Sequence, residues 1–248
     1  MAQGFSGDWW KNKHNTHHAV PNVHGGDPDI DTLPFLAWSE HALEGFSDPK
    51  AKESLPKFLI DNQVFFYTPL LTFARFSWLM QSILHVHDRR RTLATYKVEA
   101  LCLTLHYVWF FSVLVFLCPG VLNKVLFLFA SQLSCGMLLA AVFSLNHNGM
   151  PVYSVEEARN MDFYRLQILT GRAVNPTVFM TWFTGGLNYQ IEHHLFPMVP
   201  RHHFHKIQPM VESLCKKHGI TYHRTGFFDG TMEIFQRLGK VGSSSRKL

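Results

Sequence analysis

The residues of this sequence best suited to chemistry are two histidine-rich triplets with the same spacing. Each triplet places its ligands at positions i, i+3 and i+4, so that on a helix they project from one face with neighbouring side chains about 5–6 Å apart. Each triplet therefore offers nitrogen or amide donors to one point in space. The donors are His14, His17 and His18 in HNTHH, and Gln190, His193 and His194 in QIEHH.

These triplets predict a metal site. One triplet plus a water molecule would satisfy a single zinc ion, so two triplets indicate more than one metal. Neutral imidazole suits zinc, copper, iron and nickel, and the spacing alone does not name the element. Neither segment reads HExxH, which excludes the metalloprotease mechanism with its glutamate base between two ligands. His147, in SLNHNGMP directly after a long apolar run, is a further candidate ligand.

Two apolar runs, residues 100–118 and 125–145, predict a membrane-spanning helical hairpin. Each run is about 20 residues long, the length that crosses a bilayer, and neither carries a formal charge. Only the short segment PGVLNK joins them. Three consecutive arginines at 89–91 precede the hairpin, whereas its loop carries only Lys124. The positive-inside rule then places both ends of the hairpin in the cytosol, on the side of the candidate ligands.

The third apolar segment, residues 58–84, is expected to lie in the membrane interface without spanning. It contains Asp61 and Arg75, and each charge would cost about 2.5–3.5 kcal/mol at the centre of a span. In the interface both charges can turn to water. The two triplets must also meet on one side of the membrane, which requires an even number of spans between them, and the hairpin already supplies two.

The composition agrees with a membrane protein. Charged residues make up 17% of the chain and hydrophobic residues 47%, whereas soluble domains carry roughly 25% charged residues. The net charge of +5 comes from basic residues that are scattered or lie beside apolar runs. This pattern favours a membrane surface over nucleic acid as a partner. The four cysteines form no CxxC pair, which excludes a zinc ribbon and a disulfide framework.

The predicted fold class is therefore mainly α: an integral membrane helical hairpin plus an interfacial helix, with a cytosolic helical cap that carries the histidine-rich metal site. Residues 203–218 predict an amphipathic helix that packs through Ile207, Met210, Val211 and Leu214. Residues 1–240 are expected to form one domain, followed by a polar, frayed tail at 241–248.

At HNTHH, SLNHNGMP and LNYQIEHHLFP the sequence resembles the membrane-bound fatty acid desaturases, specifically their front-end group. QIEHHLFP is a specific signature of that group, in which glutamine replaces the first histidine of the third histidine box. The stretches GFSGDWWKNKHNTHH and VFSLNHNGMP are similar to fungal delta-6-type enzymes. The resemblance extends over nearly the whole chain, from about residue 3 to about residue 240.

The resemblance implies a non-haem centre of two iron ions, O2 as co-substrate, electrons from cytochrome b5, and a fatty acyl lipid substrate carried on a phospholipid or coenzyme A. The implied reaction introduces a cis double bond between an existing double bond and the carboxyl end. A multi-pass protein of the endoplasmic reticulum with its metal site facing the cytosol is implied as well. The family's ligand positions fall on His14, His17 and His18 (second box), Gln190, His193 and His194 (third box), and His147 (the additional ligand).

The sequence departs from the family pattern upstream of its first triplet. Family members carry a first, HDxxH-like box before the second box, and many front-end members carry a cytochrome b5 domain with an HPGG haem motif. Neither motif occurs in this sequence. We therefore expect the chain to be the C-terminal part of a desaturase, with two ligands missing and no activity of its own.

Four other functions are compatible with parts of this pattern. Within the enzymes these are a related di-iron hydroxylase and a desaturase of the sphingoid base of a ceramide. A catalytically inactive fragment that binds a partner desaturase is a third. A histidine-rich metal transporter is the fourth, but a transporter would place histidines within its spans, and both triplets lie outside them.

Overall fold

The computed structural model describes residues 3–48, 51 and 53–248, and its contacts divide the chain into two compact units. The first unit comprises residues 1–15 and 68–141, and the second comprises residues 16–67 and 142–248. Residues 1–2, at the start of the domain predicted over 1–240, lie outside the described residues. The chain passes between the units within three helices, α1 (Gly7–Ala19), α3 (Gln63–Thr72) and α6 (Gly120–His147).

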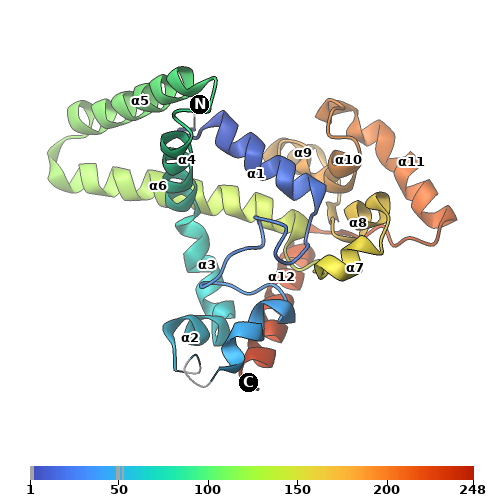
Figure 1. Cartoon of the computed structure of the whole chain (residues 1–248). Coiled ribbons are helices and arrows are strands. Elements are labelled where there is room, and N and C mark those ends of the chain that lie inside the picture. Colours follow the sequence, from blue (N-terminus) through green and yellow to red (C-terminus); the bar gives the residue numbers. More distant parts are fainter. Residues whose placement is uncertain (1–2, 49–50, 52) are drawn as a thin grey trace. The chain divides into compact units, whose positions relative to one another are not determined.

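The first unit contains the predicted hairpin. Helix α5 (Tyr96–Ser112) continues through a π-helical turn, η2 (Val113–Leu117), and the chain then reverses into α6 (Figure 1). Among the described residues, Tyr96–Leu117 and Gly120–His147 are long and apolar enough to cross a membrane, each with a mean hydropathy of 2.1. The first stretch begins before the span predicted over 100–118 and ends one residue short of it, whereas α6 extends beyond the predicted 125–145 at both ends and begins inside the segment predicted as the hairpin loop.

Large apolar side chains on this hairpin face outward. Phe116 is 81% exposed and Val121 is 79% exposed. An apolar surface of this kind is costly in water and favourable in hydrocarbon. The hairpin therefore has the surface expected of a membrane-spanning element.

The segment predicted as one interfacial element, residues 58–84, is divided among three helices. These are α2 (Leu55–Asp61), α3 and α4 (Ala74–Asp88). Asn62 and Phe73 separate them. Only the two hairpin helices of the described chain meet the length and apolarity needed for a span, so this segment is not among them.

Arg75 was expected to turn to water, and that prediction is wrong. It is 5% exposed within the first unit. Its Nε donates to Oε1 of Gln132 over 3.1 Å, and its guanidinium lies 4.5 Å from the ring centre of Phe5. An amide oxygen and an aromatic face together replace part of the hydration that the charge loses.

The second unit consists of short helices joined by capped turns. Ser154 and Glu157 form a reciprocal capping box at the start of α7 (Val155–Arg159), and Asp162 accepts the Arg165 N–H at the start of α8 (Phe163–Leu169). Two parallel strands, β1 (Ala173–Val174) and β2 (Arg224–Thr225), pair in register. The remaining elements are η1 (Glu40–Ser47), α7 (Val155–Arg159), α8 (Phe163–Leu169), α9 (Val178–Phe183), η3 (Leu187–Tyr189), α10 (Gln190–Leu195), η4 (Arg201–His203), α11 (Phe204–Lys217) and α12 (Phe227–Ser245).

One hydrophobic cluster of this unit supports the QIEHH helix. It joins α8, β1, α10 and α11 through Ile168, Ala173, Ile191, Val211 and Cys215. Ile191 is fully buried in this cluster, and this packing holds α10 in place.

Helix α11 matches the amphipathic helix predicted over 203–218, but its packed face differs. Phe204, Gln208, Val211 and Cys215 are its buried residues, whereas Met210 is 66% exposed and Leu214 is 56% exposed. The buried stripe is rotated because the helix packs on Ile191 through Val211 and Cys215.

The tail predicted to be frayed is helical as far as Ser245. Val241 and Ser245 are fully buried. The ammonium group of Lys57 donates to the Ser245 carbonyl over 2.8 Å and to the Asp61 carboxylate over 3.0 Å. These contacts fix the end of α12 against α2.

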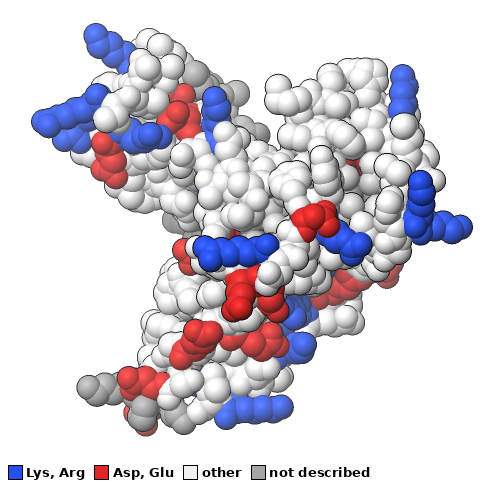
Figure 2. Space-filling model, turned by 45° about the vertical axis from the view of Figure 1, so that its right-hand side comes forward, with Lys and Arg blue, Asp and Glu red and all other residues white. Residues whose placement is uncertain are grey.

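Most of the face drawn in Figure 2 is uncharged, and several of its acidic side chains lie directly beside basic ones.

Candidate metal centre

Three histidines from three elements of the second unit converge. They are His17 of α1, His147 at the last position of α6 and His194 of α10, and each is at most 6% exposed. The Nε2 atoms of His17 and His147 lie 3.3 Å apart, and those of His147 and His194 lie 2.9 Å apart. Their ligand atoms all lie within 4.8 Å of one another, which is close enough for one metal ion.

The opposite ring nitrogen of each histidine faces a hydrogen-bond acceptor. Nδ1 of His17 lies 2.9 Å from Oδ2 of Asp27, and Nδ1 of His147 lies 2.9 Å from the Thr170 carbonyl oxygen. Nδ1 of His194 lies 2.7 Å from Oε1 of Gln167. Carboxylate and carbonyl oxygens only accept, so in a neutral ring Nδ1 carries the hydrogen and Nε2 carries the lone pair.

Three Nε2 lone pairs therefore point toward one another. This arrangement is repulsive by itself and becomes favourable around a shared cation. Metal-binding histidines typically donate their other N–H to a carboxylate or a carbonyl, as these three do. The residues thus fit a metal ion that prefers nitrogen ligands.

The electrostatics of the cluster also favour neutral imidazoles. Burial, followed by the neighbouring imidazoles of His147 and His17, holds the pKa of His194 well below its ordinary value of 6.5. The lone pair of His194 is therefore available to a metal at neutral pH.

A second pair of donors lies beside the first cluster. Nε2 of His18 and Nε2 of His193 are 3.1 Å apart. The ring of His18 stacks on that of His194 with 4.1 Å between ring centres. The two members of each HH dipeptide therefore serve different groups, although the spacing alone predicted that each triplet would converge on one point.

Gln190 lies at the edge of the first cluster. Its Nε2 is 2.8 Å from Nε2 of His147. Its Oε1 is buried and has no hydrogen-bond partner among the described residues. A rotation of the amide would present this oxygen to the cluster in place of the N–H.

His14 belongs to the first unit, one turn before His18 in α1. Its ring stacks on Trp10 with 4.9 Å between ring centres. Its role as a ligand stays a prediction. His202, His203 and His205 repeat the spacing of neither triplet, and they belong to none of the metal-capable groups found among the described residues.

Sequence reasoning did not identify the acceptors behind the histidines. Asp27 follows the first triplet in HGGDPDI, and Gln167 and Thr170 lie within the largely apolar LQILTG. All three are buried. Polar residues at helical spacing inside an apolar stretch are a signal for a buried polar network, and this signal was available.

The buried carboxyl group of Glu192 holds α10 through a contact outside the histidine cluster. Burial raises the pKa of this carboxyl group to about 7. The hydroxyl of Tyr222 donates to its Oε1 over 2.9 Å, which connects α10 to the segment that leads into β2.

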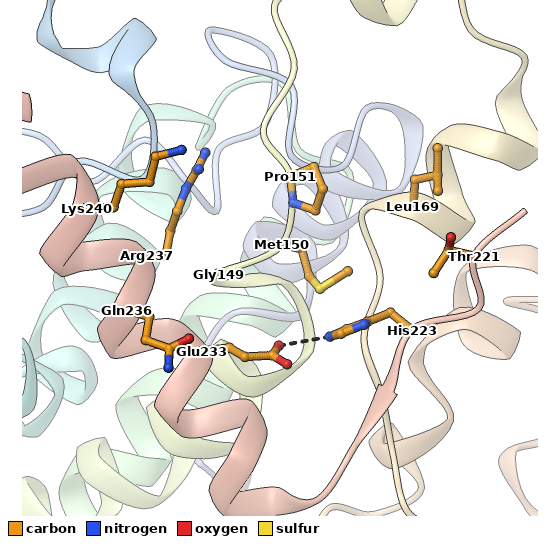
Figure 3. A pocket seen from close by; sticks show the side chains of 10 residues that line it. All are labelled: Gly149, Met150, Pro151, Leu169, Thr221, His223, Glu233, Gln236, Arg237 and Lys240. Carbon is orange, nitrogen blue, oxygen red and sulfur yellow. Dashed lines mark hydrogen bonds and ion pairs between the residues drawn. The ribbon is translucent and has the colours of Figure 1, made fainter.

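A separate cavity of about 560 Å³ lies beside the residues that follow His147. Gly149 and Met150 line it on one side and Arg237 of α12 on another (Figure 3). Within it, Nε2 of His223 lies 2.9 Å from Oε2 of Glu233, shown as the dashed line in Figure 3.

Comparison with known proteins gives consistent matches over this chain. A family model described as fatty acid desaturase matches residues 1–226. The acyl-lipid (9-3)-desaturase of Physcomitrium patens is 39% identical over 247 residues, covering 98% of this chain and 45% of that protein. Two proteins of Caenorhabditis elegans are also similar. The delta(6)-fatty-acid desaturase is 38% identical, covering 96% of this chain and 54% of that protein. The delta(5) fatty acid desaturase is 36% identical, covering 100% of this chain and 56% of that protein.

The chain thus spans about half the length of these curated relatives. No solved structure matches it.

Proposed function

The chain belongs to the fatty acid desaturase family, and from this premise we propose that the protein is a front-end acyl-lipid desaturase. Its reaction is the O2-dependent introduction of a cis double bond into an already unsaturated acyl chain. The observation that carries this proposal is the convergence of the Nε2 lone pairs of His17, His147 and His194. The desaturase domain is proposed to comprise residues 1–240.

We propose that two iron ions are bound by these histidine groups. His17, His147 and His194 would hold one ion, and His18 and His193 would contribute to the other. His14 is proposed as a ligand on the spacing of its triplet alone. Bound iron supplies the activation of O2 that is needed to remove hydrogen from an unactivated methylene group. The side-chain amide of Gln190 lies against the first group through its nitrogen, and after rotation of the amide its oxygen would act as a further, weaker ligand.

The protein itself keeps the ligand nitrogens of these histidines neutral, holds them in a fixed orientation and excludes water from them. Asp27, Thr170 and Gln167 each hold one Nδ1–H, so each Nε2 lone pair points inward. Burial of the three rings excludes bulk water and keeps protons off the ligand nitrogens. Neutral ligands add no negative charge to the metal ions.

We propose that the two apolar helices fix the enzyme in the endoplasmic reticulum membrane, where its acyl lipid substrate resides. The arginines at 89–91 precede the first of these helices. By the positive-inside rule these arginines favour a metal site on the cytosolic side, which is the orientation we propose. Cytochrome b5 is the proposed electron donor on that side.

The position of the new double bond has to be determined by analysing the product. The relatives named above carry different positions in their names, delta(5) and delta(6). The chemistry of the metal ligands is common to these reactions, so the metal site does not choose between them.

Expression in yeast tests this function. The coding sequence that contains this chain is expressed in cells fed polyunsaturated precursors, and both fatty acids and sphingoid bases are analysed by gas chromatography and mass spectrometry. We expect a new double bond between an existing one and the carboxyl end, and its loss in His194→Ala. A hydroxylated product, or a new double bond only in sphingoid bases, would contradict the proposed reaction.

A further inference from the structure

We infer that the segment from Gln167 to Arg172 is a positioning element that orients the ligand rings of His147 and His194 and holds the backbone of α1 beside them. This inference rests on the proposed metal centre. The segment itself supplies no ligand. It runs from the end of α8 to the start of β1, and Gln167, Thr170 and Arg172 are each 0% exposed.

Gln167 connects two of the ligand-bearing helices through one amide group. Its Nε2 donates to the carbonyl oxygen of His18 in α1 over 2.9 Å. Its Oε1 accepts from Nδ1 of His194 in α10 over 2.7 Å. Because the donor end of the amide is engaged by the His18 carbonyl, only the oxygen is available to His194. The side chain therefore fixes both the tautomer and the rotation of that ring.

Thr170 orients the ring of His147. Its carbonyl oxygen accepts from Nδ1 of His147 over 2.9 Å. The position of this carbonyl is fixed because Thr170 caps α8, with its hydroxyl donating to the Leu166 carbonyl over 2.6 Å. The ring of His147 is thus held by backbone that cannot readily rotate.

Arg172 donates hydrogen bonds to backbone carbonyls on both sides of His147. Its N–H donates to the Asn146 carbonyl over 2.8 Å. Its Nη1 donates to the carbonyl oxygens of Leu145 over 2.6 Å and Asn148 over 3.0 Å. The Leu145 and Asn146 carbonyls belong to the last turn of α6, where carbonyls lack partners within the helix, and Asn148 directly follows the helix. One residue therefore fixes where α6 ends, and with it the place of His147.

The charge of Arg172 is balanced on its other side. Glu233 of α12 accepts from Nε over 2.9 Å and lies 2.8 Å from Nη2. His223 lies against the same carboxylate oxygen, at the cavity of Figure 3. The carboxylate keeps the guanidinium in its buried position against the end of α6.

These contacts matter for a metal because its ligands must be held to within about 0.5 Å of the productive geometry. Loss of an outer hydrogen-bond partner typically costs about 10–100-fold in metal affinity. A segment that only packs would instead affect stability without a matching effect on the metal. The two roles are therefore separable by experiment.

The test compares two buried glutamines of the second unit. Gln63, like Gln167, is 0% exposed, and its amide bonds to Ala37 and Leu238 instead of to histidines. The variants are Gln167→Met, Gln167→Glu and the matched controls Gln63→Met and Gln63→Glu. For each, Co²⁺ is titrated as a spectroscopic probe, and unfolding of the metal-free chain is measured separately.

We expect Co²⁺ affinity to fall at least about tenfold in Gln167→Met, with a changed ligand-field spectrum. The fall should be smaller in Gln167→Glu, whose carboxylate still accepts from His194 but cannot donate to the His18 carbonyl. The Gln63 variants should bind Co²⁺ like the wild type even though their unfolding midpoint falls.

Wild-type affinity in Gln167→Met, or an equal loss in Gln63→Met, would overturn the inference. If Gln167→Met does not fold, the Co²⁺ affinities of Gln167→Glu and Gln63→Glu are compared instead. Wild-type affinity in Gln167→Glu, or an equal loss in Gln63→Glu, would then overturn the inference. A wild-type chain that binds no Co²⁺ would instead refute the proposed metal centre itself, so the two failures are distinguishable.

Discussion

Asp27 accepts the Nδ1–H of His17 over 2.9 Å through a carboxylate whose side chain is fully buried. The same oxygen accepts the Asn22 N–H over 2.8 Å, and the other carboxylate oxygen accepts the Asp29 N–H over 2.8 Å. The turn after α1 therefore fixes the carboxylate, and the carboxylate fixes the ring. A carboxylate in this position also makes the imidazole a stronger donor to a metal.

Replacing Asp27 by asparagine should weaken metal binding and destabilise the fold. The amide has one acceptor where the carboxylate has two, so at least one buried N–H loses its partner, at a cost of about 2 kcal/mol. We expect metal affinity to fall about 10–100-fold. Co²⁺ titration and denaturant unfolding of the metal-free chain measure the two effects.

Asp29→Asn is the matched control, because the Asp29 carboxylate is 3.6 Å from Nδ1 of His17 and is 33% exposed. It should retain most of the affinity. Equal losses in the two variants would mean that Asp27 has no special role in orienting His17.

Much of this site could be predicted from sequence, because a helix places i, i+3 and i+4 on one face wherever it occurs. Both triplets lie on helices, α1 and α10. His147 was expected just past the apolar run 125–145, and it is the last residue of α6. The grouping could not be predicted, because it depends on which side chains other helices bring near. His17 and His194 meet through His147, and His18 meets His193.

In the fold, too, features set by neighbouring residues were predicted, whereas features set by contacts between distant residues were not. The hairpin follows from apolar length, and its two membrane-capable helices were predicted from sequence. The burial of Arg75 was not, because it depends on Gln132, which is distant in the chain. The order of the tail likewise depends on Lys57, which contacts Ser245 across most of the sequence.

Gly136 allows α6 to approach the end of α3 within the first unit. A Cβ at this position would collide with the Thr72 carbonyl oxygen and lie 3.2 Å from the Arg75 backbone nitrogen. These contacts are with backbone, which cannot move aside as a side chain can. We therefore expect Gly136→Ala to destabilise the protein by about 1–3 kcal/mol, measured by unfolding in detergent.

Gly45→Ala provides the comparison, since nothing lies within 4 Å of the added Cβ there. Its effect should be within about 0.5 kcal/mol of the wild type. A Gly136→Ala protein as stable as Gly45→Ala would show that the helices do not pack at this glycine.

Tyr67 should make the protein sensitive to alkaline pH. It is 2% exposed, with its ring against Trp38 and Phe235, and burial raises its pKa from 10.0 to about 12. Above roughly pH 10 the unfolded chain releases a proton that the folded chain retains, so stability falls as the pH rises from 10 toward 12. By linkage this contributes about 1 kcal/mol between roughly pH 9 and pH 11.

Denaturant unfolding of the wild type and Tyr67→Phe at these two pH values checks this effect. The variant should lose about 1 kcal/mol less than the wild type over the interval. The same loss in both proteins would show that Tyr67 is not buried as described.

The iron content of the purified chain tests the central claim most directly. The chain is loaded with Fe²⁺ without oxygen, freed of excess metal, and its iron is measured per polypeptide for the wild type, His194→Ala and His205→Ala. His205 is an exposed histidine of α11, outside the metal-capable groups of the described chain. We predict that the wild type and His205→Ala retain iron and that His194→Ala loses it. A wild-type chain without iron, or a His194→Ala chain that retains as much as the wild type, would contradict the account.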